Sequence, residues 1–201
     1  MKLTTLLRRF IDGRCPGDKL PATLDLTGIR RTMKQLWNAS IRNIATGVVL
    51  EHAATLVRNI EGKARLAYPV VGTAGNVEPN YDVAQDETFI GTFHTHPYEN
   101  SLTGIAFSGG DIASAINETE WISLVQSGDD VFALIRTDKT VPSVDSNIVV
   151  NQVNDLYEDL LNIRLSHQSA LRIANLQICA TYGLAFYAGK ISGILEVKFK
   201  P

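Results

Sequence analysis

The residues of this chain that are best suited to chemistry lie between His94 and Asp111. His94 and His96 are one residue apart, so a β-strand would present both imidazoles on one face, because its side chains alternate with a period of two. Asp111 supplies a third ligand after a loop. Three protein ligands with no evident fourth are typical of a catalytic zinc site, which keeps one position for water. A structural zinc usually has four Cys or His ligands, and only Cys15 and Cys179 are present, far apart in sequence.

Amide hydrolysis is one reaction for which such a site is suited. Zinc lowers the pKa of a bound water to about 7, a nearby carboxylate accepts its proton and passes it to the leaving amine, and a hydroxyl stabilises the oxyanion. Ser108 precedes Asp111 by three residues, so at a helix start both side chains can point in the same direction. The general base must come from another part of the chain.

Glu51 is the strongest candidate for that base. It lies within the apolar segment 48–57, where a carboxylate is costly unless it is paired or used. Glu61 falls in a polar turn, and Glu78 and Glu87 fall in loop-like sequence. The alternative interpretation of Glu51, a glutamate on an edge strand that faces water, stays open.

The elements that must position these residues follow from periodicity. Apolar residues at steps of three and four predict a helix over 29–44 that ends at Thr46-Gly47. Strands are predicted at 48–57, 64–71 and 88–93, and the last of these leads directly into His94. Ser108 can cap a helix over 109–119. Further along the chain the pattern predicts strands at 121–126 and 131–136, helices at 149–163 and 168–182, and a small hairpin at 184–188 and 193–199.

These elements suggest three parts. Residues 1–28 form a loose N-terminal arm, because Gly and Pro punctuate them. Residues 29–146 form the core that carries the motif. Residues 147–201 form C-terminal helices and a small hairpin that pack on the core, although the same helices could instead form a homodimer interface.

The motif residues resemble a known enzyme family. His94-Thr95-His96-Pro97, followed by Ser108-Gly109-Gly110-Asp111 and preceded by Glu51, is similar to the pattern of the JAMM (MPN-type, JAB-domain) zinc metallopeptidases. The resemblance covers roughly residues 29–136. It implies an α/β fold, the cytidine-deaminase-like sandwich of a mixed curved sheet flanked by helices, here with a C-terminal helical appendage.

The resemblance also implies roles for the site residues. His94, His96 and Asp111 would bind Zn²⁺, Glu51 would act as the acid and base, and Ser108 would stabilise the oxyanion. The implied activity is cleavage of an isopeptide or peptide bond after ubiquitin or a ubiquitin-like protein, for example in a bacterial antiphage system. Two alternatives stay open: a peptidase of the same type that acts on a sulfur-carrier, phage-tail or toxin polypeptide, and a non-catalytic MPN scaffold, against which the intact residue set argues.

One departure from the family pattern concerns spacing. Residues 97–107 separate His96 from Ser108, a gap longer than is usual in the family, and this loop could grip the tail of a substrate. Ser127 and Asp130 have the same mutual spacing as Ser108 and Asp111, but they fall in a predicted hairpin turn remote from the histidines.

Charge and composition indicate which binding partners and which cellular location to expect. The net charge of −2 gives no electrostatic reason to expect nucleic acid or an acidic membrane. No apolar run approaches the length of a membrane span, and Arg8 and Arg9 interrupt the stretch where a secretory signal would be apolar. We therefore expect a soluble cytoplasmic protein.

Overall fold

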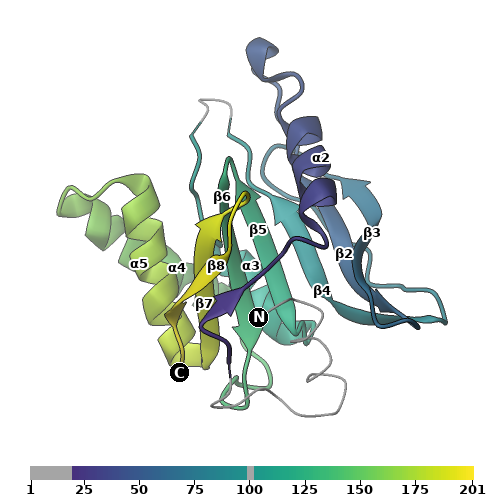
Figure 1. The fold of residues 1–201 in the computed structure, drawn as a ribbon. Coiled ribbons are helices and arrows are strands. Elements are labelled where there is room, and N and C mark those ends of the chain that lie inside the picture. The colour runs from purple at the N-terminus through teal and green to yellow at the C-terminus, as the bar shows by residue number, and fades with distance from the viewer. Residues whose placement is uncertain (1–19, 99–101) are drawn as a thin grey trace.

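The computed structural model describes residues 20–98 and 102–201, which fold around one eight-stranded sheet (Figure 1). The spatial order of the strands is β1-β8-β7-β6-β5-β4-β2-β3. Their bounds are β1 Thr23–Leu24, β2 His52–Asn59, β3 Ala64–Val71, β4 Glu87–Thr95, β5 Ile122–Ser127, β6 Asp130–Arg136, β7 Leu184–Lys190 and β8 Leu195–Phe199.

The only parallel pair of this sheet is β4 with β5; the other described neighbours are antiparallel. A parallel pair needs a crossover, and α3 (Gly109–Asn117) supplies it. In this register His94 pairs with Val125 and Thr95 with Gln126. The crossover therefore begins beside the carboxyl end of β4, where the two histidines lie.

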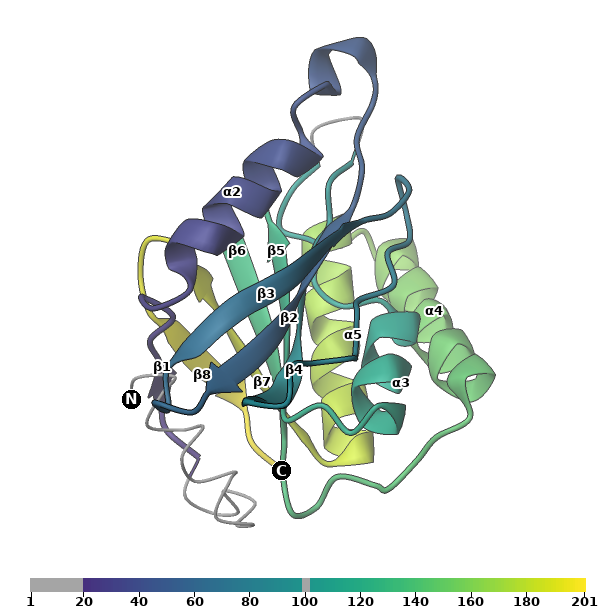
Figure 2. The same ribbon diagram turned by 90° about the vertical axis from the view of Figure 1, so that its right-hand side faces the viewer.

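Helices cover both faces of the sheet (Figure 2). Helix α2 (Arg30–Ser40) lies on one face and buries Met33 and Leu36 against it. Helices α3, α4 (Ser146–Asn162) and α5 (His167–Tyr182) lie on the other face. Each face has its own apolar core, and the predicted α/β class with a mixed sheet flanked by helices is confirmed.

The predicted helix over 29–44 is too long. Helix α2 ends at Ser40, and a short 3₁₀ turn, Ile44–Thr46, follows it. Gly47 has φ 74°, a left-handed conformation that glycine adopts without steric cost, so the chain reverses there. Strand β2 consequently begins later than predicted, and Glu51 is the residue immediately before it.

The C-terminal hairpin is part of the main sheet. This corrects the expectation that the hairpin packs on the core formed by residues 29–146. Strand β7 pairs with β6 along its whole length, and β8 pairs with β7.

The described end of the N-terminal arm is also packed, contrary to the expectation of a loose arm. Strand β1 pairs with the outer edge of β8, so this edge of the sheet is not left open. Leu24 and Leu26 are buried in the apolar core. Residues 1–19 of the predicted arm lie outside the described residues.

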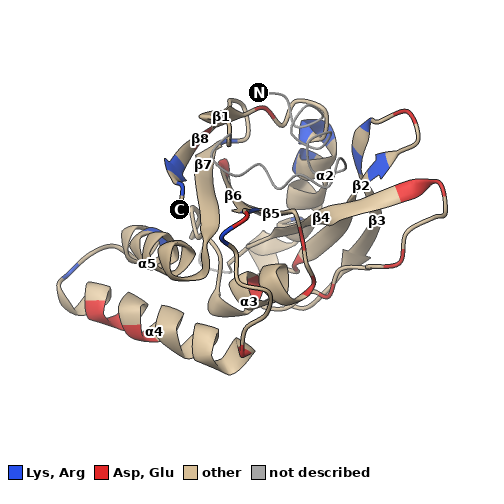
Figure 3. Cartoon of the chain, turned by 90° about the horizontal axis from the view of Figure 1, so that it is seen from below, with Lys and Arg blue, Asp and Glu red and all other residues tan. Residues whose placement is uncertain are grey.

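Charged residues are dispersed along the ribbon of Figure 3, where acidic residues occur on α4 and basic residues on α2 and near β8. Within the described ranges, no helix combines the length and apolar character needed to cross a bilayer.

Candidate metal centre

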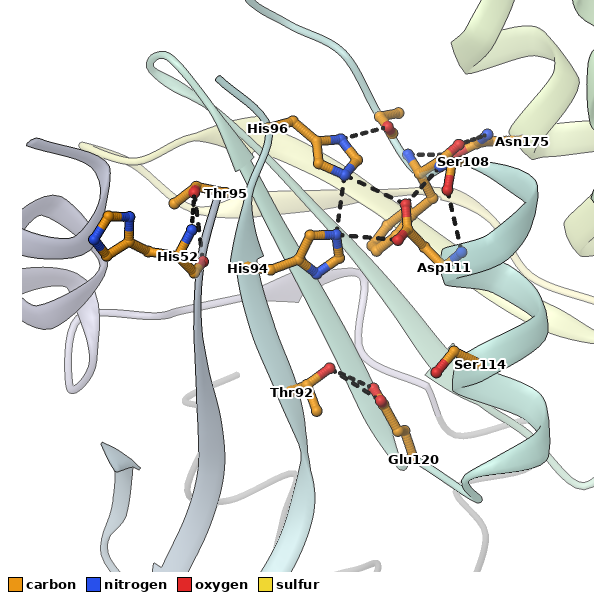
Figure 4. A network of polar contacts seen from close by, with 12 residues as sticks. His52, Thr92, His94, Thr95, His96, Ser108, Asp111, Ser114, Glu120 and Asn175 are labelled. Atoms are coloured by element: carbon orange, nitrogen blue, oxygen red, sulfur yellow. Dashed lines mark hydrogen bonds and ion pairs between the residues drawn. The ribbon is translucent and has the colours of Figure 1, made fainter. Parts of the chain in front are cut away.

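The three predicted metal ligands converge at the carboxyl end of β4 (Figure 4). The Nε2 atoms of His94 and His96 lie 3.0 Å apart. The carboxylate of Asp111 completes a triangle, with Oδ1 3.2 Å from His94 Nε2 and Oδ2 3.3 Å from His96 Nε2. Both histidines are buried and the aspartate is partly buried, so these donor atoms are held in a largely desolvated setting.

The size of this triangle fits a tetrahedral metal ion. Nitrogen and oxygen ligands bind zinc at about 2.0–2.1 Å, so two ligands of a tetrahedron lie about 3.3 Å apart. The observed N–N separation of 3.0 Å and the N–O separations of 3.2 and 3.3 Å, which end on different oxygens of Asp111, are each close to this length. His94, His96 and Asp111 can therefore hold a metal ion, and all three residues line one cavity.

Asp111 is oriented by the start of α3. Ser108 caps this helix as predicted: its Oγ accepts a hydrogen bond from the Asp111 backbone N–H at 3.2 Å. The Asp111 Oδ2 atom in turn accepts from the Ser108 backbone N–H at 2.7 Å. This reciprocal capping box fixes the carboxylate before any metal binds. It leaves the Ser108 hydroxyl hydrogen free for another acceptor, since a hydroxyl both accepts and donates.

His96 is oriented through its other ring nitrogen. Nδ1 lies 3.1 Å from the carbonyl oxygen of Ala106, a group that can only accept, so Nδ1 carries the proton. Nε2 is then left with its lone pair directed at the centre of the triangle. A backbone carbonyl in this role is the common way in which proteins fix the tautomer of a metal-binding histidine.

The three ligands also stabilise one another electrostatically. Burial by itself would raise the pKa of Asp111, but the two histidines lower this pKa well below its ordinary value. Burial would likewise lower the pKa of His96, yet the hydrogen bond and the attraction of Asp111 raise it. The surroundings of Asp111 thus favour the ionised form of its carboxyl group.

Glu51 lines the same cavity as these ligands, a hollow of about 750 Å³. The residue is 8% exposed, and its backbone is bonded to the chain beyond β3, with Glu51 N–H donating to Thr73 O at 2.7 Å and Gly72 N–H donating to Glu51 O at 2.9 Å. Burial raises the pKa of the Glu51 carboxyl, while the charges of His96 and His94 oppose the rise. The interpretation of Glu51 as a glutamate facing bulk water is therefore wrong.

The other glutamates considered from sequence have different surroundings. Glu61 forms an exposed ion pair with Lys63 at 2.7 Å. Glu87 is bonded to Arg65 and Tyr68 on the far part of the β3 edge. Glu78 is exposed at the rim of the cavity.

The alternative serine and aspartate do not form a second site. Ser127 is buried and donates its hydroxyl to the His96 carbonyl at 3.1 Å, so it is closer to the histidines than predicted. Asp130 binds Lys190 at 3.0 Å and Arg172 at 3.4 Å instead of turning toward the imidazoles. Ser108 and Asp111 are the pair at the candidate metal centre.

Sequence reasoning missed the residues that support the site from behind. Thr95 lies on the opposite face of β4 from the two imidazoles, and its Oγ1 accepts from the His52 backbone N–H at 2.9 Å and lies 2.7 Å from Ser40 Oγ. This contact ties the start of β2, and with it Glu51, to the histidine strand. The position of a threonine between two histidines was the only available signal.

Comparisons of the chain with family models, with curated proteins and with solved structures found no match.

Proposed function

We propose that this protein is a zinc-dependent peptidase of the JAMM type, which cleaves an isopeptide or peptide bond after ubiquitin or a ubiquitin-like protein. One observation supports this proposal above all. Two imidazole nitrogens and the oxygens of one carboxylate lie 3.0–3.3 Å apart, close to the ligand separation around a tetrahedral zinc ion, and the buried Glu51 lines the same cavity. Metal-assisted hydrolysis needs a ligand set that leaves one coordination position for water and a base near that position, and this group of residues could supply both.

The residues then have separate tasks. A zinc ion held by His94, His96 and Asp111 would lower the pKa of a water molecule toward 7 and polarise the scissile carbonyl. Glu51 accepts a proton from the attacking water and delivers it to the leaving amine, and its raised pKa brings it nearer to neutrality, where a general base is most effective. Ser108 donates its free hydroxyl hydrogen to the oxyanion that forms beside the metal ligands.

We further infer that the fold belongs to the cytidine-deaminase-like class. Support comes from the order of elements, in which α2 precedes the β2–β3 hairpin and α3 connects the parallel strands β4 and β5. The ligands sit where that crossover starts.

The first experiment measures metal content and hydrolysis together. Purified protein should contain about one zinc ion per chain by elemental analysis, and the double variant His94→Ala/His96→Ala should contain almost none. Hydrolysis is assayed on linear fusions in which ubiquitin, or a β-grasp sulfur-carrier protein, precedes a fluorescent reporter, and on a mixture of unstructured peptides. We expect cleavage after the ubiquitin-like part, and loss of cleavage with a chelator.

The outcomes separate the alternatives. Cleavage of the sulfur-carrier fusion or of peptides alone would keep the chemistry and change the substrate. Zinc-loaded protein that cleaves none of these probes would contradict the proposed function, and undiminished cleavage in a chelator would contradict the metal mechanism.

A further inference from the structure

The cavity of the metal centre extends along β4 beyond the ligands. Thr92 precedes His94 by two residues on this strand, so both side chains lie on the same face, about 7 Å apart along the strand. Glu120 lies at this far end, where its carboxylate oxygens accept from Thr92 Oγ1 at 3.0 and 2.9 Å (Figure 4). Both residues line the same hollow as the metal ligands, and so does Ser123.

Glu120 is a buried carboxylate that no cation accompanies in the described part of the chain. It is 4% exposed, and its partners are neutral hydroxyls, Thr92 and Ser123. None of the ion pairs between described residues includes Glu120, and none of the described residues that line the cavity is Lys or Arg. When it is ionised, a carboxylate in this setting is normally paired with a cation or bound to a metal ion.

The neighbouring charges also favour the binding of a cation at this end of the cavity. Glu118 and Glu78 are exposed residues that also line the cavity, so the side away from the metal ligands is acidic. Ser114 and Tyr81 add hydroxyl groups, 3.4 Å apart, at this end. A positively charged group that entered here would meet one buried carboxylate, two acidic neighbours on the rim and no competing cation from the described lining.

We propose that the Glu120 end of the cavity binds a lysine or arginine side chain of the substrate, one or two residues from the scissile bond. The spacing sets this range, because about 7 Å along β4 corresponds to two residues of an extended substrate, which spans about 3.3–3.6 Å per residue. The position relative to a scissile bond rests on the proposed function, whereas the affinity for a cationic side chain does not.

The protonation behaviour of Glu120 agrees with this role. Burial raises its pKa to about 7, although the hydrogen bonds from Thr92 and Ser123 act in the opposite direction. The ionised form of the Glu120 carboxyl is therefore held at a cost near neutral pH. A bound ammonium or guanidinium group would remove that cost, and an uncharged side chain of the same length would not.

The first test measures binding without hydrolysis. Acetyl-argininamide and its uncharged counterpart acetyl-norleucinamide are titrated into the zinc-loaded protein by calorimetry. The wild type should bind the arginine probe about tenfold more tightly than the norleucine probe. Glu120→Gln should lose this preference, Glu118→Gln should weaken arginine binding by about twofold because its charge is exposed, and Glu61→Gln should leave it unchanged.

Equal affinity of the wild type for the two probes would overturn the proposal, and that comparison needs no variant. The proposal would also fail if a folded Glu120→Gln protein kept the preference. If Glu120→Gln does not fold, the wild-type comparison and the smaller effect of Glu118→Gln decide the matter.

The second test separates this inference from the proposed function. Quenched fluorescent peptides carry arginine or norleucine at each of the two positions on either side of the cleaved bond. We expect kcat/KM to be about tenfold higher with arginine at one of these positions, and the advantage to disappear in Glu120→Gln. Cleavage without any such preference would refute the pocket and leave the peptidase intact. Selective binding of acetyl-argininamide without any cleavage would refute the peptidase and leave the pocket intact.

Discussion

The side chain of Asn175 on α5 forms two hydrogen bonds with the backbone of Phe107. The Phe107 N–H donates to Asn175 Oδ1 at 3.0 Å, and Asn175 Nδ2 donates to the Phe107 carbonyl at 2.8 Å. Phe107 stands between Ala106, whose carbonyl orients His96, and Ser108, which caps the helix of Asp111. A helix from the last quarter of the chain thus fixes the segment that supports His96 and Asp111, two of the candidate metal ligands.

Asn175→Leu should therefore weaken both folding and metal binding. It leaves two buried backbone groups of Phe107 without partners, which costs about 2–4 kcal/mol of the free energy of unfolding. Because residues 106–108 then lose their anchor, we also expect lower zinc affinity. Denaturant unfolding and a competitive zinc titration measure the two effects. Gln177→Leu, an exposed position on the same helix, is the control and should change neither quantity appreciably. Unchanged zinc affinity in Asn175→Leu would show that the segment holds its position without α5.

Two adjacent glycines at the start of α3 offer a matched comparison. A Cβ atom at Gly109 would lie 2.5 Å from the Val150 Cα of α4, so Gly109→Ala forces the two helices apart. We expect a loss of about 1–3 kcal/mol in stability and weaker metal binding, because Asp111 moves with the helix. At Gly110 the nearest atom is Ser108 Oγ at 3.6 Å, an ordinary contact, so Gly110→Ala should stabilise the helix by about 0.5–1 kcal/mol. Equal effects of the two substitutions would contradict the close packing of α3 on α4.

The sequence was sufficient to predict that His94, His96 and Asp111 come together, and to predict the local elements that carry them. A strand that ends in His94 and His96, and a capped helix that carries Asp111, depend on periodicity and capping, both of which act over a few residues. The burial of Glu51 was also predictable, because a carboxylate in an apolar segment has a high cost unless the fold uses it.

The long-range contacts could not be predicted in this way. The pairing of β7 with β6 joins residues about fifty positions apart, and nothing local distinguishes such a strand from one half of an isolated hairpin. Asn175 contacts a residue 68 positions away in the sequence, and Glu120 contacts one 28 positions away. Within its own segment, each is an ordinary polar residue. The end of α2 at Ser40 was missed because the apolar spacing continues through Ile41 and Ile44 after the hydrogen-bonded helix has stopped.

Glu51→Gln should separate metal binding from hydrolysis. The amide keeps the shape of the side chain and is not one of the three ligands, so zinc content should stay near that of the wild type. It cannot accept a proton, so kcat for cleavage of the reporter fusion should fall by about 10²–10⁴-fold. Glu61→Gln, which alters an exposed ion pair, is the control for the loss of one carboxylate. A Glu51→Gln enzyme that cleaves as fast as the wild type would show that another group is the base.

Glu120 should make stability depend on pH in a predictable direction. Its pKa rises from an ordinary value of 4.5 to about 7 in the folded protein, so between these values the native state binds more protons than the unfolded chain. The free energy of unfolding contributed by this group therefore falls as the pH rises from below 4.5 to above 7, by about 3 kcal/mol in all. The pKa of Glu51 shifts in the same direction and the pKa of Asp111 in the opposite one. Both shifts are present in the wild type and in Glu120→Gln, so they cancel in the comparison.

The difference between these two proteins isolates the Glu120 contribution. Urea unfolding of the metal-free proteins at about pH 5 and about pH 8 should show that Glu120→Gln gains up to about 3 kcal/mol relative to the wild type at the higher pH. Saturating acetyl-argininamide should reduce that gain, because a cation in the pocket stabilises the ionised wild-type carboxylate and has no charge to meet in the variant. A stability difference that is the same at both pH values would mean that Glu120 titrates as an ordinary exposed glutamate.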